Sequence, residues 1–490
     1  MKKTALVFAF VPIAMLSATA CDRASLPEVT DAPQRILRVE NGLRSPLRLR
    51  EEEPLLTTIG EQLEKWSTPG ISVAVVDDYE VQWARGFGIV EAGSDQPVTN
   101  TTLFQAGSIS KPVAAILASI LESDGQLDLD QPIARYLKSW EIPKNEFGAS
   151  NKITARQLMT HRAGFNTHSY FFESEEGMPP LNEVLRGEHG DPPAEVVMSP
   201  GAQNVYSNPG FVVLEQVIED ANGREFDELS RQLLFEPLRM NNSSFAEPLD
   251  LELLARTASA HDSSGEMIEG RWKIAPASAG GMWATAGDLA VLATEIMAAW
   301  KGSDDRLISH EMARELFDPD STGQALGFQV SGEGQALCAQ HGGGMIGMRA
   351  WMMIFPEIGK AGVVMANGAE GTMVLSQVMA AIGAEYKWPG YPVVRERVAL
   401  GDEKLDEYVG QYRYDSLPEY VMDIRSADGA LEGRVIEGSP FLIEASSDED
   451  VFFYRDRGQE LRFRRNEEGV VAAITFSIAG FSGSTLTRIE

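Results

Sequence analysis

Ser108 and Lys111 stand three positions apart in the stretch Gly107-Ser108-Ile109-Ser110-Lys111-Pro112. Because proline is tolerated in the first turn of a helix, Pro112 places Ser108 at or just before a helix start, with Lys111 on the same side of that turn. A serine hydroxyl becomes a good nucleophile when a neighbouring base takes its proton, and lysine can be that base when burial lowers its pKa. The pair therefore predicts a nucleophile with its general base. The alternative is a capping serine followed by a solvated lysine.

A tyrosine and an asparagine form the second pattern, Tyr206-Ser207-Asn208, directly before the turn-forming pair Pro209-Gly210. We therefore expect Tyr206 on a loop that leads into a helix. Beside a serine and a lysine, a phenol can pass a proton between nucleophile and leaving group, and an asparagine amide can orient a substrate carbonyl. A loop tyrosine on its own is usually a packing residue.

The third pattern is His341-Gly342-Gly343-Gly344, which follows a strand-like run. Glycines allow close backbone approach, so a substrate could lie against this strand and main-chain amides could point at a developing oxyanion. The alternative is a glycine-rich turn with a bystander histidine.

Each pattern occurs once: there is one Ser-x-x-Lys, one Tyr-x-Asn and one His-x-Gly in the chain. In this order and at these separations they resemble the serine β-lactamase and penicillin-binding-protein superfamily, closest to its class C-like branch with D-aminopeptidases, DD-peptidases and β-lactamase-like esterases. The stretches Leu158 to Gly164 and Gly280 to Ala286 also look like that branch, and the resemblance covers residues 55–390.

The resemblance implies an α+β chain with a three-layer α/β/α β-lactamase-like (transpeptidase-like) fold. Ser108 would be the acylated nucleophile, and Lys111 and Tyr206 would share the general base and acid work. Asn208, His341 and Gly343 would bind substrate, and the backbone N–H groups of Ser108 and Gly344 would form the oxyanion hole. His161 matches a Thr-His element of the family, to which we assign a structural role.

One position departs from the family pattern. β-Lactamases of this branch usually carry lysine where His341 stands, and there the lysine helps to hold the antibiotic's carboxylate. A largely neutral imidazole is a weaker anchor for an anion. Hydrolysis of a peptide or ester is therefore expected ahead of β-lactam turnover, and Arg349 is a further candidate to meet a carboxylate.

The elements that must position these residues can be read from periodicity. Alternating β-branched residues over 71–76 and a second extended run over 81–90 predict a hairpin. Apolar residues at three- and four-residue spacing predict a helix over 111–122. Further helices are expected over 211–218 and 288–300, and strands between 327 and 365. From residue 405 onward, short extended runs separated by turns predict a small antiparallel barrel or sandwich.

Composition excludes several classes of function. The 490-residue chain has 72 acidic and 42 basic side chains, a formal net charge of −30. Such a chain is repelled by nucleic acid and by anionic lipid, so neither is an expected partner. With two cysteines there is no disulfide framework and no zinc motif, so we expect no metal and no cofactor.

The amino terminus predicts export. Two lysines, an apolar stretch over 5–20 and small residues before Cys21 are typical of a secretory signal, which gives a periplasmic location. Ala18-Thr19-Ala20-Cys21 resembles a bacterial lipobox, in which Cys21 is lipidated and anchors the protein; the alternative is plain cleavage near Ala20. Cys338 is expected to be a buried small hydrophobe.

These patterns divide the chain into a signal peptide (1–20), a tether (21–54), a hydrolase domain (55–390), a linker (391–400) and a small barrel (401–490), which resembles the lipocalin-like domain that follows some of these enzymes. The barrel either limits access to the site or stabilises the first domain. The predicted function is a serine hydrolase that forms an acyl-enzyme with a small peptide, amide or ester. The alternatives are a β-lactamase and, from another class, an inactive lipoprotein that binds peptides or peptidoglycan. The sequence leaves the oligomeric state open.

Overall fold

The computed structural model describes residues 32–147, 152–303, 306–414, 420–427, 429–435, 440–454, 458–478 and 481–489. The predicted signal peptide and Cys21 lie outside these residues. Among the helices described, none combines the length and the hydropathy that a membrane span requires.

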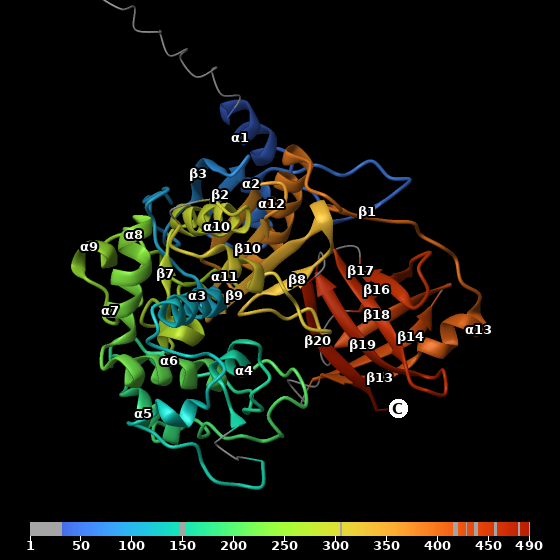
Figure 1. Ribbon diagram of the computed structural model, residues 1–490. Helices are drawn as coiled ribbons and strands as arrows, with labels where there is room; N and C mark the ends of the chain where they lie inside the picture. Colours follow the sequence, from blue (N-terminus) through green and yellow to red (C-terminus); the bar gives the residue numbers. More distant parts are fainter. Residues whose placement is uncertain are drawn as a thin grey trace, which may run out of the picture.

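A six-stranded antiparallel sheet is the centre of the larger unit, with the strand order β3-β2-β11-β10-β9-β8 (Figure 1). Its strands are β2 (Gly70–Asp77), β3 (Glu80–Gly88), β8 (Gln329–Ser331), β9 (Cys338–Met345), β10 (Met348–Phe355) and β11 (Lys360–Ala366). Successive side chains of a strand point to opposite faces. Ile71, Val73 and Val75 therefore pack into one hydrophobic cluster, while Ala74 and Val76 pack into the other.

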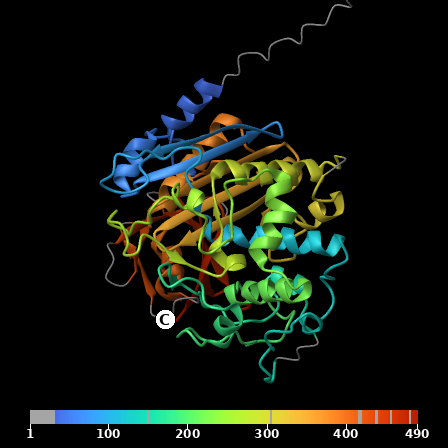
Figure 2. The ribbon, with the colours of Figure 1, turned by 90° about the vertical axis from the view of Figure 1, so that its left-hand side faces the viewer.

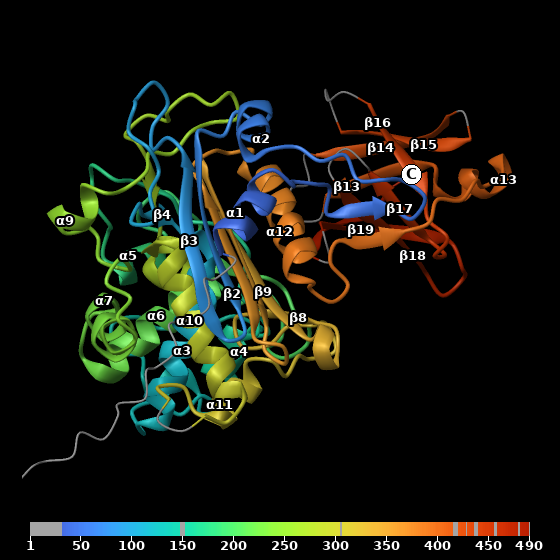
Figure 3. The ribbon, with the colours of Figure 1, turned by 90° about the horizontal axis from the view of Figure 1, so that it is seen from above.

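Helices cover both faces of this sheet, which makes three layers (Figure 3). One face carries α1 (Ala32–Glu40), α2 (Ile59–Lys65) and α12 (Gly371–Tyr386). The other carries α10 (Ala286–Trp300), and beyond it α3 (Ser110–Ser123) in the larger cluster. The hairpin, the three helices and the strands predicted from periodicity are confirmed, and so is the three-layer fold.

A helical region lies on the α3 side, and Figure 2 shows it from the side turned away from the barrel. Its helices are α4 (Ala155–Met159), α5 (Leu181–Arg186), α6 (Asn208–Asn222), α7 (Phe226–Ser230), α8 (Glu236–Leu238), α9 (Leu251–Leu254) and α11 (His310–Glu315). Short elements connect it to the sheet: β4 (Phe104–Gln105), η1 (Gly107–Ile109), β5 (Phe172–Glu173), β6 (Lys273–Ile274), η5 (Ala277–Gly281) and β7 (Trp283–Ala284). Ser108 lies in η1, as the position of Pro112 predicted.

The tether prediction for residues 21–54 is wrong for the described part of that segment. α1 packs on α12, and β1 (Leu47–Leu49) pairs in parallel with β12 (Val393–Arg395), which lies within the predicted linker. Val39 of α1 and Leu43, which follows the helix and forms a bridge with Thr57, are both buried in the hydrophobic cluster that includes α12. The apolar residues of α1 and β1 are too few to give a recognisable periodicity among the surrounding arginines and glutamates.

The carboxyl-terminal unit is a closed eight-stranded antiparallel barrel in which each strand pairs with the next and β13 pairs with β20. Its strands are β13 (Gly410–Tyr414), β14 (Val421–Ala427), β15 (Ala430–Val435), β16 (Phe441–Ala445), β17 (Val451–Tyr454), β18 (Gln459–Arg465), β19 (Val471–Ile478) and β20 (Phe481–Arg488). Short helical turns, α13 (Asp402–Leu405) and η7 (Asp406–Tyr408), precede it. The barrel lies beyond α12 in Figure 3 and contacts the first unit through the cluster of Leu47, Leu49 and Phe453.

Candidate active site

Ser108 is held where η1 passes directly against β9. Gly107 has φ +53°, and a Cβ there would lie 2.6 Å from the Gly344 nitrogen. A Cβ on Gly343 would lie 1.9 Å from the Ala106 carbonyl oxygen. Both positions therefore require glycine, because any side chain would separate the two backbones. The glycines of the third sequence pattern bring β9 up to the serine.

Lys111 is fully buried below Ser108. Its Nζ lies 3.0 Å from Ser108 Oγ and donates a hydrogen bond of 2.5 Å to the Ala279 carbonyl oxygen of η5. No carboxylate within the described ranges forms an ion pair with Lys111, and burial lowers the pKa of its amine to about 7. A substantial fraction of the amine is therefore neutral at pH 7 and can accept the Ser108 proton.

Tyr206 also contacts Ser108. Its hydroxyl donates to Ser108 Oγ at 2.8 Å, and its ring centroid lies 5.0 Å from Lys111 Nζ. The residue is 42% exposed, which leaves it open to a substrate, while desolvation raises the pKa of its hydroxyl above the usual value. At neutral pH Tyr206 is therefore a protonated hydrogen-bond donor to the serine oxygen. The structure brings Ser108, Lys111 and Tyr206 into direct contact.

His161 fixes the loop that carries Tyr206. Its backbone oxygen accepts from Val205 N at 2.9 Å, and its Nδ1 accepts from Ser207 N at 3.1 Å. The imidazole lies 4.4 Å, centroid to centroid, from the Tyr206 ring. Burial and the nearby Lys111 charge lower the pKa of His161 well below its usual range, so it stays neutral. It makes no bond to Ser108 within the described structure, which fits the structural role expected for it.

Asn208 is the first residue of α6, directly after the Ser207 N-cap. Its amide donates to Ser169 Oγ at 2.9 Å and to the His168 carbonyl at 3.3 Å. These bonds point the amide at the 168–169 segment, and none of those in the described structure reaches Ser108 or Lys111. Substrate contact by Asn208 stays a prediction.

His341 lies on β9, with its ring centroid 6.4 Å from that of Tyr206. Its Nδ1 is 2.6 Å from the Gly342 carbonyl, so Nδ1 carries the proton. Burial and the Lys111 charge lower the pKa of His341 to about 3. The imidazole is therefore neutral at physiological pH and supplies no positive charge to the site. Arg349, the other candidate for a carboxylate, is engaged by the Met345 and Met348 carbonyl oxygens.

The sequence patterns did not predict the group that orients the Lys111 amine, which is a carbonyl oxygen of η5. Glu215 of α6 accepts a hydrogen bond of 2.8 Å from Ser278 N, and Ser278 Oγ donates to the Phe211 carbonyl. These bonds hold η5, whose Ala279 oxygen receives the Lys111 amine. A main-chain acceptor has no residue-type signature, and Glu215 stands in an apolar helical run, so no sequence signal was available.

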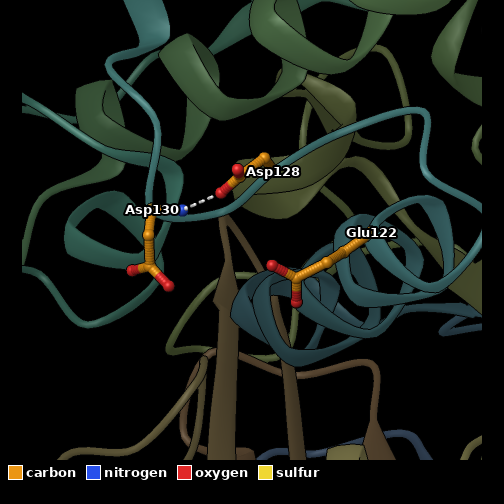
Figure 4. Close-up of side chains that lie close together, drawn as sticks. All are labelled: Glu122, Asp128 and Asp130. Atoms are coloured by element: carbon orange, nitrogen blue, oxygen red, sulfur yellow. Dashed lines mark hydrogen bonds between the residues drawn. The ribbon is translucent and has the colours of Figure 1, made fainter.

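Three carboxylates outside this site lie close together: Glu122, Asp128 and Asp130, within 4.8 Å of one another (Figure 4). Each of them already has a hydrogen-bond or ion-pair partner that stabilises the loop after α3. Glu122 accepts from Leu129 N, Asp128 accepts from Asp130 N, and Asp130 pairs with Arg156 at 2.8 Å. These bonds account for the cluster, and nothing else in the described structure points to a metal there.

Comparison with known proteins identifies the family. Residues 56–381 match the family model Beta-lactamase. Unguisins hydrolase ungD' of Aspergillus campestris is 27% identical over 202 residues, 39% of this chain and 36% of that protein. Beta-lactamase of Pseudomonas fluorescens is 26% identical over 213 residues, 43% of this chain and 55% of that protein. The chain thus spans about a third to a half of the length of these relatives.

Solved structures share the fold. The crystal structure of SurE superposes with a TM-score of 0.59 at 23% identity, covering 88% of this chain and 97% of SurE. D-alanine carboxypeptidase AmpC of Burkholderia cenocepacia gives a TM-score of 0.53 at 20% identity, covering 66% of this chain and 96% of that one. The family model covers well over half of the chain, and the chain therefore belongs to the beta-lactamase family of hydrolases.

Proposed function

We propose that the protein is a serine hydrolase that forms an acyl-enzyme through Ser108 with a small peptide, amide or ester. The observation that carries the proposal is the position of Ser108 Oγ, 3.0 Å from Lys111 Nζ and 2.8 Å from the Tyr206 hydroxyl. A nucleophile within hydrogen-bond reach of a base is the geometry that covalent catalysis requires. Relatives named as an unguisins hydrolase and as a beta-lactamase support hydrolysis as the reaction.

In the first half of the reaction, neutral Lys111 takes the proton of Ser108, and Ser108 Oγ attacks the substrate carbonyl carbon. The oxyanion is stabilised by the backbone N–H groups of Ser108 and Gly344, and one such donor is typically worth about 3 kcal/mol in the transition state. Tyr206 then passes a proton to the leaving amine or alcohol, which departs and leaves an ester on Ser108.

In the second half, water replaces the leaving group. The Tyr206 phenolate left by the first half takes a proton from the water as it attacks the ester carbonyl, and protonated Lys111 gives its proton to Ser108 Oγ as the acid product leaves. The amine and the phenol are restored to their starting protonation states. The same two side chains serve both halves because both contact the serine oxygen.

The charge of the site favours neutral substrates. Neutral His341 stands where a cation would be needed to hold a carboxylate, and the Lys111 amine is partly neutral at pH 7. We therefore propose a substrate without a carboxylate next to the scissile bond. A β-lactamase is the second candidate, which a relative named as a beta-lactamase favours.

Intact-mass measurement after exposure to a fluorophosphonate and, separately, to a penicillin tests this proposal. We expect the fluorophosphonate to add its mass to the wild type and not to Ser108→Ala. Slow labelling by penicillin without turnover favours a peptidase or esterase, whereas rapid penicillin turnover favours a β-lactamase. If neither reagent adds mass, the inactive binding protein becomes the better proposal.

We also propose export to the periplasm and a lipid anchor at Cys21, both supported by the amino-terminal sequence pattern alone. Growth of an expressing bacterium with an alkyne-tagged fatty acid should label the wild type and leave Cys21→Ser unlabelled. Secretion of an unlabelled wild-type protein would instead show plain cleavage near Ala20.

A further inference from the structure

A cavity lies beside η5, the turn whose Ala279 carbonyl oxygen accepts a hydrogen bond from Lys111. Its volume is about 460 Å³, within the range of small-molecule sites. Ala277 and Gly281 of η5 line it, while Ala279 between them turns its carbonyl oxygen to Lys111. Ser108, Lys111 and Tyr206 do not line it, so it is separate from the catalytic centre. The helices α5, α6 and α7 that border it lie together in Figure 1.

Negative charge dominates its wall. Five of the residues that line the cavity carry carboxylates: Glu215 and Glu219 of α6, Glu225 and Asp227 at the start of α7, and Glu247. The lining, all of it in the described structure, includes no lysine and no arginine. Carboxylates gathered without a cation repel one another, so a positively charged ligand would relieve this repulsion. A chain with a net charge of −30 also attracts cations at long range.

An independent feature, a buried side chain with an unused acceptor, points to the same ligand. Gln105 lines the cavity and is only 2% exposed. Its Nε2 donates to the Lys273 carbonyl at 2.6 Å, which fixes the orientation of the amide. Its Oε1 has no hydrogen-bond partner within the described part of the chain. A buried acceptor without a donor is costly, and a ligand that donates hydrogen bonds would satisfy it.

The remaining wall is apolar and aromatic, formed by Phe226, Phe245 and Trp283 among others. Aromatic faces attract cations and also pack against hydrocarbon. A hydrated metal ion would make no apolar contact with this surface. An organic cation can pair with the carboxylates and also pack against the aromatic rings.

We propose that this cavity is a second binding site, for a primary ammonium group carried on an apolar or aromatic body. The ammonium would donate to Gln105 Oε1 and to the carboxylates of Glu219 and Glu247. The apolar part would lie against the aromatic wall. The site does not depend on hydrolysis at Ser108, because it shares with the catalytic centre only the η5 turn and Glu215, which holds that turn, and no hydrogen bond within the described residues joins either to Ser108.

The pKa values of the carboxyl groups that line the cavity are consistent with this assignment. Burial raises the pKa of Glu215 to about 7 and of Glu247 to about 7, and burial together with Glu215 raises that of Glu219 to about 8. Glu225 and Asp227 are the other titratable groups that line the cavity, and both are acidic. A bound cation favours the ionised carboxylates, so its affinity should rise from pH 6 to pH 8 as their protons leave.

Calorimetric titration of Ser108→Ala with 2-phenylethylammonium tests the site without turnover, and 2-phenylethanol is the neutral probe of matched shape. Glu247→Gln is the main variant, because Glu247 makes no hydrogen bond within the described residues and its loss should not disturb the fold. Glu219→Gln is the second, and its amide oxygen can still accept from Phe226 N. Glu252→Gln on α9, exposed and outside the cavity, is the matched control.

We expect the ammonium to bind at least tenfold more tightly than the alcohol, and Glu247→Gln and Glu219→Gln each to weaken it about fivefold while Glu252→Gln leaves it unchanged. Equal binding of the ammonium and the alcohol would overturn the proposal. So would unchanged binding by both cavity variants, or displacement of the ammonium by millimolar Ca²⁺ or Mg²⁺.

Discussion

Lys111 owes its chemistry to its burial, with no counter-ion among the residues that the structure describes. Burial lowers the pKa of its amine from 10.5 to about 7, which makes the amine a base at neutral pH. The serine hydroxyl, the Ala279 carbonyl and the Tyr206 ring surround it with dipoles rather than with charge. The sign of the pH dependence follows, because only the deprotonated amine can accept the Ser108 proton.

The first prediction concerns the pH profile of acylation. The second-order rate of fluorophosphonate labelling should rise about tenfold per pH unit below pH 7, and level off above about pH 8. The inflection should lie near pH 7, the pKa of Lys111. A profile that is flat between pH 5.5 and 8.5 would remove Lys111 from the role of base.

The second prediction links this pKa to stability. The unfolded chain binds a proton at Lys111 up to about pH 10.5 and the folded chain only up to about pH 7, so the buried lysine destabilises the fold most at and below pH 7. Lys111→Met should therefore raise the free energy of unfolding by about 1–3 kcal/mol at pH 7, after the loss of the Ala279 bond, while abolishing acylation. Urea unfolding at several pH values measures this, and the gain should shrink towards pH 10.

The third prediction concerns the hydroxyl of Tyr206, tested apart from the packing of its ring. Tyr206→Phe keeps the ring on His161 and removes only the hydroxyl that donates to Ser108 Oγ. Acylation should fall about 10²–10⁴-fold, the usual contribution of a general acid or base, while the melting temperature stays within a degree or two. An unchanged labelling rate would show that Lys111 acts alone.

The three catalytic candidates could be found from the sequence because serine, lysine and tyrosine carry chemistry in their side chains and their patterns occur once. The Ala279 carbonyl that receives the Lys111 amine could not, because it is a main-chain atom 168 residues away along the chain. The protonation state of His341 was predicted only in part. Its neutrality was expected, but the pKa near 3 depends on burial beside Lys111, which only the fold creates.

At the scale of elements, the contact between η1 and β9 is made backbone to backbone. A fourth prediction compares two neighbouring glycines of β9. Gly343→Ala places a Cβ 1.9 Å from the Ala106 carbonyl, so η1 and β9 must separate, whereas the nearest atom to a Cβ on Gly344 is Arg349 Nη1 at 4.0 Å. Fluorophosphonate labelling should fall by at least 100-fold in Gly343→Ala and by less than tenfold in Gly344→Ala, which keeps its N–H.

Circular dichroism and the melting temperature serve as controls for this pair. Both variants should keep the far-ultraviolet spectrum, and the melting temperature should drop in Gly343→Ala alone. Equal labelling of the two would mean that the close approach of β9 to η1 does not position the nucleophile.

Elements with a sustained apolar period were predicted well, and short ones were missed. The helix predicted over 111–122 is α3, where five large apolar residues recur at three- and four-residue spacing and all five are buried. β1 and β12 have three residues each and, within the described residues, form a two-stranded sheet of their own whose partners lie 346 positions apart (Leu47 and Val393). Strands this short have too few residues to show an alternation of apolar and polar side chains, and tertiary contacts decide their pairing.

At the scale of the molecule, the two units are joined by a small apolar contact and by ion pairs. Phe453 is fully buried and packs on Leu47 and Leu49 of β1, while Arg395 donates to Glu460 at 2.9 Å. β1 pairs with β12, so part of the segment predicted to be a tether packs against the barrel and connects it to the first unit. This arrangement favours the stabilising role for the barrel over direct control of the site.

The last prediction tests that role with two adjacent phenylalanines of β17. Phe453 faces the first unit, and Phe452 lies in the core of the barrel. Removing a buried phenylalanine typically costs about 3–5 kcal/mol. Phe453→Ala should therefore speed tryptic cleavage within residues 396–404 while the excised barrel stays protease-resistant, whereas Phe452→Ala should make the barrel itself cleavable. Fluorophosphonate labelling of Ser108 should be unchanged in Phe453→Ala if the barrel only stabilises, and a rate altered more than threefold would instead assign it control of access to the serine.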